Sequence, residues 1–360
     1  MPGGKKIKRI DVIATTISGS ISDWQKVKRI VPLFVEQGFE DVRLHEVNSH
    51  SSAREAAYAA LKDGSRIPIS AGGSGTFRAV LEGCIDSGVN LLDVRLGFLR
   101  KGSADLIGKV LNMPDDIDSA IKVFAKSITS DSYVSADILN ASCISCNENP
   151  RHFIGYGGAE IFGRIPFYTE NRYNKYYKGI MSQLFGDLGP FTTGMLLSLT
   201  EKLLKSPFTR KKHWQIIADG ELALEGYYQA IIIVNGYLGP DMPFSDKSLG
   251  SGEFYVFGLK DIGVLKLISQ AKHARSGTIV KDPLRWGLES VTIKKVLELT
   301  PDNDAPFPVN VDGSTFIAKK SMTFKRVAKI PLISNVSISN TEPPNVTLQE
   351  FKSSLIDFIP

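Results

Sequence analysis

The chain has 360 residues, of which 42% are hydrophobic and 22% charged, and its net charge is +5. This composition excludes a disordered chain, argues against a nucleic-acid-binding protein and leaves room for two domains. No apolar stretch is long enough to cross a bilayer as a helix, so we expect a cytoplasmic protein. A transient contact with an anionic membrane surface stays open.

The first third of the chain alternates short apolar runs with amphipathic stretches. We expect strands over residues 10–15, 41–47 and 66–70, and helices over residues 23–38, 52–64 and 76–88. Pro32 lies inside the first helical pattern, where it would kink or interrupt the helix. Gly88 is suited to end the third helix. Strands and helices in this alternation predict a parallel sheet with covering helices.

From about residue 130 the pattern changes to short alternating runs separated by Gly, Asn and Asp. Such runs predict antiparallel hairpins and a β-sandwich-like second domain. A helical insert over about 175–205 interrupts this domain, and a final helix over 345–360 is expected to pack back on the first domain. We therefore predict an α/β domain over 1–128 and a β-sandwich domain over 129–335.

The chain has three cysteines, Cys84, Cys143 and Cys146. This number is too small for a disulfide framework and fits a reducing compartment. Cys143 and Cys146 form a single CxxC pair, and no second pair is present to complete a zinc site. We interpret both as small apolar residues beside a strand and predict no metal site.

The stretch "AGGSGT" at 71–76 lies between the third predicted strand and the third predicted helix. Glycines let backbone amides surround an anion without obstruction by a Cβ, and the start of a helix adds partial positive charge. Thr76 is suited to cap the helix or to bond a phosphate oxygen. The loop alone is also explained by a tight structural turn, so both interpretations stay open.

Five segments in register resemble the diacylglycerol kinase catalytic family, which includes bacterial lipid kinases, sphingosine kinases and ceramide kinase and is related to NAD kinases. "AGGSGTFRAVLEG" occupies the place of the family's GGDGT motif, and "TTISG" at 15–19 resembles its NPxSG. "LGFLRKGSADLIG" at 96–108 resembles LGxxPxGTxNDFA. In the second half, "VNGYLGPDMPFSDKSLGSG" and "VDGSTF" resemble the segments that end in DDG and DGE.

The resemblance implies an α/β nucleotide domain followed by a β-sandwich domain. It also implies transfer of a phosphoryl group from ATP, with Mg²⁺, to a lipid hydroxyl of a diacylglycerol or sphingoid-like acceptor. The phosphate-binding residues that it implies are Ser18, Gly19, Gly72, Gly73, Ser74, Gly75, Thr76, Gly102 and Ser103. Asp105 and Asp312 keep family positions and are the catalytic candidates. Their structural alternatives are a helix cap for Asp105 and a hairpin-turn residue for Asp312.

The chain departs from the family where acidic and amide side chains are expected. The positions of the acids are occupied by Ser74, Ala79, Gly250, Ser251 and Ser314, and Ala104 replaces an asparagine. A hydroxyl is neutral at pH 7 and is a poor ligand for Mg²⁺. Arg100 and Lys101 stand where the family has apolar residues or proline; they would either add positive charge near the phosphates or be exposed loop cations.

Two functional hypotheses follow. The first is an active ATP-dependent lipid kinase, acting on a lipid or another small hydroxyl acceptor at the inner membrane face. The second is a catalytically degenerate member, a pseudokinase, that binds nucleotide or lipid as a regulatory, carrier or scaffold protein. We expect no nucleic-acid partner, and a homodimer is left open.

Overall fold

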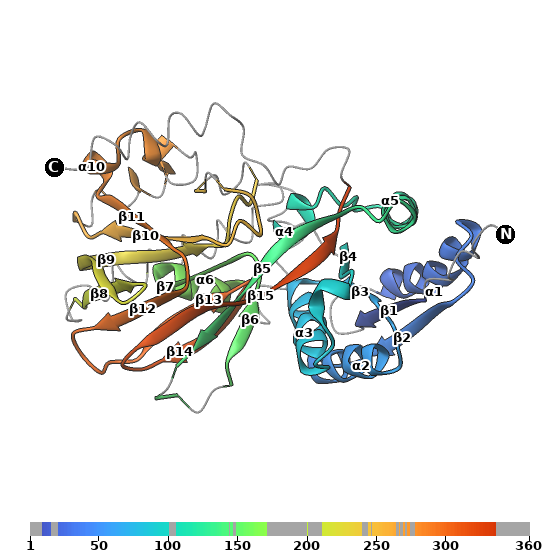
Figure 1. Cartoon of the computed structure of the whole chain (residues 1–360). Helices are drawn as coiled ribbons and strands as arrows, with labels where there is room; N and C mark the ends of the chain where they lie inside the picture. Colours follow the sequence, from blue (N-terminus) through green and yellow to red (C-terminus); the bar gives the residue numbers. More distant parts are fainter. Residues whose placement is uncertain are drawn as a thin grey trace. The chain divides into compact units, whose positions relative to one another are not determined.

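The computed structural model describes residues 9–15, 21–100, 106–143, 145–146, 149–170, 200, 211–239, 244–245, 247–263, 266, 269–270, 272–273 and 278–335. Within these ranges the side chains of 21–25 and 166–170 are not described. The helix expected over 345–360, and all of the insert expected over 175–205 except Thr200, lie outside the described residues. The chain forms two compact units, the first within Met1–Ala136 and Ala328–Asn340, the second mainly within Asp137–Val327 (Figure 1).

The first unit contains a four-stranded parallel sheet in the order β2-β1-β3-β4. Its strands are β1 (Ile10–Thr15), β2 (Val42–Val47), β3 (Ile67–Gly72) and β4 (Gly97–Arg100). Its helices are α1 (Ile21–Glu36), α2 (His50–Lys62), α3 (Ser74–Asp86), α4 (Leu106–Val110) and α5 (Ile117–Ser130), with a short 3₁₀ turn η1 (Leu91–Asp93) before β4. The predicted parallel sheet with covering helices is confirmed.

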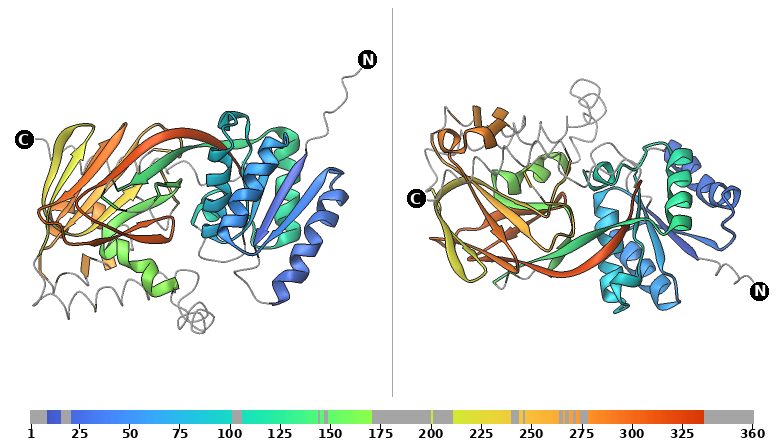
Figure 2. Two further views of the ribbon diagram at one scale, coloured as in Figure 1. Left: turned by 90° about the horizontal axis from the view of Figure 1, so that it is seen from below. Right: turned by 45° about the horizontal axis from the view of Figure 1, so that its top comes forward.

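Helices α2 and α3 pack together on one face of this sheet, and α1 and α5 pack together on the other (Figure 2). All six residues of β1 and all six of β3 are buried, as expected for central strands covered on both faces. Helix α1 continues through Pro32, so the proline does not interrupt it. Gly88 follows the end of α3 with φ +66°, the left-handed conformation predicted for a helix stop.

The second unit is built from antiparallel strands. They are β5 (Tyr133–Ser142), β6 (Arg151–Phe153), β7 (Tyr156–Glu160), β8 (His213–Ala218), β9 (Glu221–Val234), β10 (Phe254–Lys260), β11 (Leu288–Ile293), β12 (Val296–Pro301), β13 (Phe307–Val311), β14 (Ser314–Ala318) and β15 (Met322–Ile333). The order is β14-β13-β7-β9-β8-β12-β15-β5-β6, and β10 pairs with both β9 and β11. Helix α6 (Ile161–Glu170), the 3₁₀ turn η2 (Thr278–Lys281) and the short helix α10 (Pro283–Trp286) accompany the strands.

Strand β9 turns this sheet into two layers. Its first half pairs with β8, and its second half pairs with β7 and β10. Gly226 lies between the two halves with φ +154°, a conformation that glycine adopts most readily. The layers enclose a core that includes Trp214, Ile231, Phe254 and Phe307, with the Trp214 and Phe307 rings 4.9 Å apart, edge to face. The predicted β-sandwich-like domain is therefore a single curled sheet that packs on itself.

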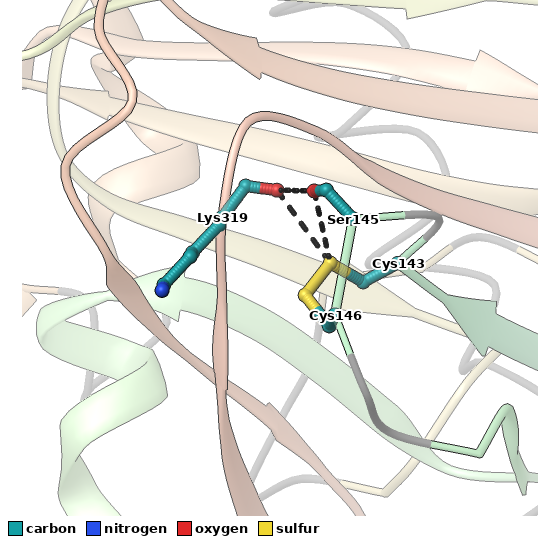
Figure 3. The surroundings of a disulfide bond; sticks show 4 residues. All are labelled: Cys143, Ser145, Cys146 and Lys319. Carbon is teal, nitrogen blue, oxygen red and sulfur yellow. Dashed lines mark hydrogen bonds between the residues drawn. A yellow bond between two sulfur atoms is a disulfide. The ribbon is translucent and has the colours of Figure 1, made fainter.

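Cys143 and Cys146 form a disulfide just after β5 (Figure 3). The chain turns tightly here, because the Cys146 amide donates to the Cys143 carbonyl, and the two Cα atoms lie 5.4 Å apart. That separation is ordinary for a disulfide. Our prediction of two unpaired apolar cysteines was wrong, since the two-residue spacing lets one turn bring the sulfurs together. Cys84 is a free buried thiol, and burial raises its pKa to about 12.

None of the helices within the described ranges has the length and apolar composition needed to span a bilayer.

Candidate functional site

The central strands β1 and β3 end side by side at the carboxyl edge of the parallel sheet. The chain leaves β1 toward β2 on one side and leaves β3 toward β4 on the other, so this edge is a topological switch point. Ligands of open parallel sheets bind outside the carboxyl ends of the strands at such points. The glycine loop of residues 71–76 lies here, because Gly72 is the last residue of β3.

Thr15 and Thr76 tie the end of β1 to the first turn of α3. Their Oγ1 atoms are 2.8 Å apart in a buried hydrogen bond. A Cβ on Gly72 would come within 2.9 Å of the Thr15 hydroxyl and 2.7 Å of the Thr76 Cβ, so the pair requires glycine at that position. The prediction that Thr76 caps the helix was wrong, because Gly73 is the N-cap residue and no side chain bonds there. The buried Thr76 hydroxyl instead stabilises the turn through its hydrogen bond with Thr15.

The first turn of α3 leaves two backbone amides without an acceptor in the helix. The amides of Thr76 and Phe77 both donate to the Gly73 carbonyl, at 3.0 Å each. The preceding amides, of Ser74 and Gly75, have no earlier helical carbonyl to bond. Ser74 is exposed, and a Cβ on Gly73 would meet nothing within 4 Å. The turn therefore offers an accessible, uncapped helix N-terminus, which suits an anion.

His50, the first residue of α2, packs against this turn. A Cβ on Gly75 would come within 2.8 Å of the His50 imidazole, so glycine gives the ring its place. Desolvation lowers the pKa of His50, and the positive charge of Arg78 lowers it further. The imidazole is thus held toward its neutral form beside Gly75. Sequence reasoning missed His50 and Arg78, because no motif links the start of α2 to the glycine loop.

Arg100 ends β4 directly beside Gly72. Its side chain is only 5% exposed and pairs with Asp115 at 3.0 Å, and it also donates to the Met113 carbonyl at 3.1 Å. Gly108 in α4 leaves room for its aliphatic stem. The interpretation of Arg100 as an exposed loop cation was wrong, because the sequence does not show that Asp115 folds back to pair with it. Lys101 lies outside the described residues.

Some of the positions singled out in the sequence lie outside the described residues. They are Ser18, Gly19, Gly102, Ser103, Ala104 and Asp105. Their roles in phosphate binding and catalysis stay predictions.

Asp312 occupies the β13–β14 hairpin turn of the second unit. Asp312 and Gly313 have φ values of +44° and +82°, the pair of positive values that a two-residue hairpin turn favours. Its carboxylate accepts hydrogen bonds from the amides of Ile154 at 2.9 Å, Gly155 at 3.0 Å and Tyr156 at 2.9 Å. The hairpin-turn interpretation is confirmed, and a catalytic role for this carboxylate stays a prediction.

Asn235 and Asp137 extend this network to the other motif of the second unit. The Asn235 side-chain amide donates to the carbonyls of Asp137 and Ile154, at 2.7 Å each. The Asp137 carboxylate accepts the Gly252 amide at 2.7 Å. The segments "VNG", "GSG" and "VDG" thus converge on a few side chains around the β6–β7 turn. Sequence reasoning missed Asp137, because it is one of several polar residues in the segment "YVSADILNAS" and nothing in the pattern distinguishes it.

The positions where the resemblance expects acids hold uncharged residues with local roles. Ala79 is buried in α3. The Ser251 hydroxyl accepts a hydrogen bond of 3.3 Å from the Glu253 amide. The Ser314 hydroxyl accepts one of 2.8 Å from the Arg151 guanidinium. No group of three or more His, Cys, Asp or Glu side chains within the described ranges is arranged to hold a metal ion. With a neutral hydroxyl at Ser74, the described part of the glycine loop does not fit Mg²⁺ as the resemblance implies.

Comparison with known proteins agrees with this geometry. Residues 9–136 match the family model of the diacylglycerol kinase catalytic domain, and the match ends where the first stretch of the first unit ends. A crystal structure of a diacylglycerol kinase from Bacillus anthracis Sterne has a TM-score of 0.65 and 16% identity, covering 93% of this chain and 99% of that chain. A second structure from the same organism has a TM-score of 0.64 and 16% identity, covering 93% and 100%. A search of curated proteins found no match.

Residues 9–136 are therefore similar to the diacylglycerol kinase catalytic domain, and the chain has a lipid-kinase-like fold.

Proposed function

We propose that this protein transfers the γ-phosphoryl group of ATP to the hydroxyl group of a lipid of the diacylglycerol or sphingoid class. The observation that carries the proposal is the uncapped start of α3 at the switch point, with open space in front of Gly73. A family match at residues 9–136 supports the same activity.

In this proposal the backbone of the glycine loop holds the phosphates. The amides of Ser74 and Gly75 donate to phosphate oxygens, and the partial positive charge of the helix N-terminus favours the anion. The exposed Ser74 hydroxyl can add a further donor. The buried Thr15–Thr76 hydrogen bond keeps the loop in position before ligand arrives. ATP, when bound, supplies the transferred group.

A second function, nucleotide or lipid binding without transfer, is favoured by a different observation. Five positions that carry acids in the family hold uncharged residues in this chain, namely Ser74, Ala79, Gly250, Ser251 and Ser314. A carboxylate that orients or deprotonates the acceptor hydroxyl is part of phosphoryl transfer, and a serine hydroxyl cannot replace its charge. Asp105 and Asp312 are the remaining acids that we propose for this task.

Calorimetric titration with ATP, with and without Mg²⁺, tests binding, and transfer of radiolabel from ATP to diacylglycerol or sphingosine in detergent micelles tests catalysis. Binding with lipid labelling supports the kinase, and binding without labelling of either lipid supports the pseudokinase. Absence of ATP binding would contradict the kinase and the nucleotide-binding form of the second function, and would leave only lipid binding.

Gly73→Asp is the variant that separates a phosphate site from a structural turn. Gly73 has an extended backbone, with φ −91° and ψ −175°, so an aspartate there can cap α3 and preserve the fold. The same carboxylate would occupy the free amides and repel phosphate. Leu92→Asp is the matched control, because it adds the same charge at an exposed site in η1. We expect ATP binding to be lost in Gly73→Asp alone; equal binding in both variants would contradict the proposed site.

A further inference from the structure

The Cys143–Cys146 disulfide lies in the connection from β5 to β6 of the second unit, and the proposed function does not use it. The two cysteines are three positions apart in the sequence, so the bond closes a very short loop. A disulfide stabilises a fold largely by restricting the unfolded chain, and this effect grows with the length of the closed loop. The fold of the second unit is therefore largely independent of this bond.

Other contacts hold the turn without the sulfur–sulfur bond. Strands β5 and β6 pair on either side of it, with Ala141 opposite Arg151. The Ser145 hydroxyl donates to the Lys319 carbonyl at 2.6 Å, which joins the turn to the connection between β14 and β15. Since neither contact involves sulfur, both can persist after reduction and keep the two cysteines near each other.

The two cysteines differ in accessibility. Cys143 is only 7% exposed and belongs to the buried core of the second unit. Cys146 is half-buried and packs against that core. Thiol–disulfide exchange begins when a thiolate reaches one sulfur of the disulfide, and access decides which sulfur is attacked. The arrangement therefore favours attack on Cys146, with Cys143 as the leaving group.

The surroundings of the Cys143 sulfur suit a thiol. The sulfur lies 3.5 Å from the Lys319 carbonyl oxygen and 3.7 Å from the Ser145 hydroxyl (Figure 3). In the disulfide this sulfur carries no proton to donate. After reduction its S–H group can donate to the carbonyl, and the thiolate that precedes it can accept from the serine hydroxyl. The leaving group thus has a hydrogen-bond partner in both forms, which offsets the cost of its burial.

We propose that Cys143 and Cys146 form a redox-active pair that exchanges with a dithiol reductant, and that Cys146 is the residue attacked. One thiolate of the dithiol attacks the Cys146 sulfur, the bond to Cys143 breaks, and Cys143 leaves as a thiolate that takes a proton from water. The second thiolate of the dithiol then attacks its partner sulfur in the mixed disulfide and releases Cys146, which is protonated in turn. The protein gains two electrons and two protons, and the dithiol becomes a disulfide.

Titration of the full chain with mixtures of reduced and oxidised dithiothreitol tests the proposal. Samples are quenched with acid, alkylated in denaturant and mapped by mass spectrometry, while circular dichroism follows the fold before the quench. We expect Cys143 and Cys146 to be reduced together, to reoxidise when the mixture is reversed, and to leave the dichroism unchanged. Cys84 is a free thiol throughout and calibrates the labelling. Reduction that occurs only with loss of the fold, or that does not reverse, would overturn the proposal.

Variants with one cysteine of the pair test which sulfur is attacked. Cys143→Ala leaves the Cys146 thiol, and Cys146→Ala leaves the Cys143 thiol in the core. In the folded state we expect dithionitrobenzoate to modify the Cys146 thiol about tenfold faster, or more, than the Cys143 thiol. The buried Cys84 adds the same slow background to both variants. Equal rates, or a faster Cys143, would overturn the proposed direction of attack.

Ser145→Ala tests the surroundings of the leaving group. It removes the hydroxyl beside the Cys143 sulfur, so reduction by dithiothreitol should become severalfold slower. Ser142→Ala, at the end of β5, is the matched control and should be reduced at the rate of the unchanged chain. Equal rates in the two variants would contradict departure of a thiolate from Cys143. None of these measurements involves nucleotide or lipid, so their failure is distinguishable from failure of the proposed function.

Discussion

Thr15 and Thr76 are 61 residues apart in the sequence, and their hydroxyl groups form a buried hydrogen bond of 2.8 Å between the end of β1 and the first turn of α3. Gly72 makes this possible, because a Cβ at that position would overlap both threonine side chains. Its neighbour Gly73 faces open space. Two adjacent glycines in one motif therefore have different roles: one permits packing, and the other keeps the start of the helix accessible.

The two glycines should respond differently to the same substitution. Gly72→Ala forces the Thr15–Thr76 pair apart and should lower the free energy of unfolding by about 1–3 kcal/mol, the usual cost of overpacking a buried site. Gly73→Ala is its matched control and should change that free energy by less than about 0.5 kcal/mol, because its backbone is extended and its Cβ meets nothing. Urea unfolding followed by circular dichroism measures both. Equal losses would show that the turn is not packed as described.

Local patterns predicted much of this fold. The buried runs at 10–15 and 66–70 and the amphipathic stretch at 76–88 predicted strands and a helix that differ from β1, β3 and α3 by at most two residues at each end. The Asp312–Gly313 pair predicted a hairpin turn for the same reason, since side-chain chemistry within two residues favours that conformation.

Contacts between distant segments could not be predicted in the same way. His50 meets Gly75 because α2 and α3 pack side by side, and neither residue alone signals the meeting. The sequence alone suggests that Arg100 is a loop cation, whereas in the structure it forms an ion pair with Asp115. Such pairings depend on where the chain crosses the sheet, and a single sequence carries no direct signal for them.

The Asp312 carboxylate should contribute several kcal/mol to the free energy of unfolding of the second unit. Asp312→Ala removes the acceptor of the amides of Ile154, Gly155 and Tyr156, and each donor left unsatisfied costs about 1–3 kcal/mol. We expect a loss of about 3 kcal/mol or more in urea unfolding. Asp304→Ala, in the exposed loop before β13, is the control and should change stability little.

Asp312→Asn separates the structural role from the predicted catalytic role. Asparagine tolerates the left-handed conformation of the turn and keeps one acceptor oxygen. If the carboxylate acts only on the turn, Asp312→Asn loses part of the stability and keeps its lipid labelling in proportion to the folded fraction. Labelling that collapses in a fully folded Asp312→Asn protein would establish the catalytic role.

Asp11 should make the first unit sensitive to acid. Burial would raise the pKa of this carboxyl, but hydrogen bonds from His45 and Arg9 outweigh it and lower the pKa to about 2. The unfolded chain, with an ordinary aspartate pKa, then binds the proton more tightly than the folded chain does. Stability is therefore fully present above about pH 4 and is lost as the pH falls toward 2, by about 2 kcal/mol in total.

Denaturant unfolding at a series of pH values checks this dependence. Asp11→Asn should flatten the curve between about pH 4 and pH 2, since the group whose pKa shifts is gone. Asp41→Asn, at a half-exposed carboxylate beside Arg43, is the control for the loss of an aspartate charge in the same unit. A curve of equal steepness in Asp11→Asn would assign the acid sensitivity to other groups.

Ser74→Asp should make nucleotide binding depend on Mg²⁺. Ser74 is the exposed first residue of α3, so an aspartate there would stand beside the proposed phosphates without disturbing the helix, whose N-terminus favours negative charge. Without metal the new carboxylate repels ATP, and we expect binding to weaken about tenfold, which corresponds to about 1.4 kcal/mol. With Mg²⁺ the charged oxygen becomes a ligand and the loss should be recovered.

Calorimetry of the unchanged chain, Ser74→Asp and Ser74→Asn with ATP, each with and without Mg²⁺, measures the effect. Ser74→Asn is the matched control, because asparagine has nearly the shape of aspartate and no charge. Mg²⁺ should therefore change the ATP affinity of Ser74→Asn no more than it changes the ATP affinity of the unchanged chain. If ATP binding by the unchanged chain already depends on Mg²⁺ as strongly as binding by Ser74→Asp does, the serine at position 74 has not removed the carboxylate that holds the metal. Another carboxylate, for which Asp105 is the candidate, would then hold the metal.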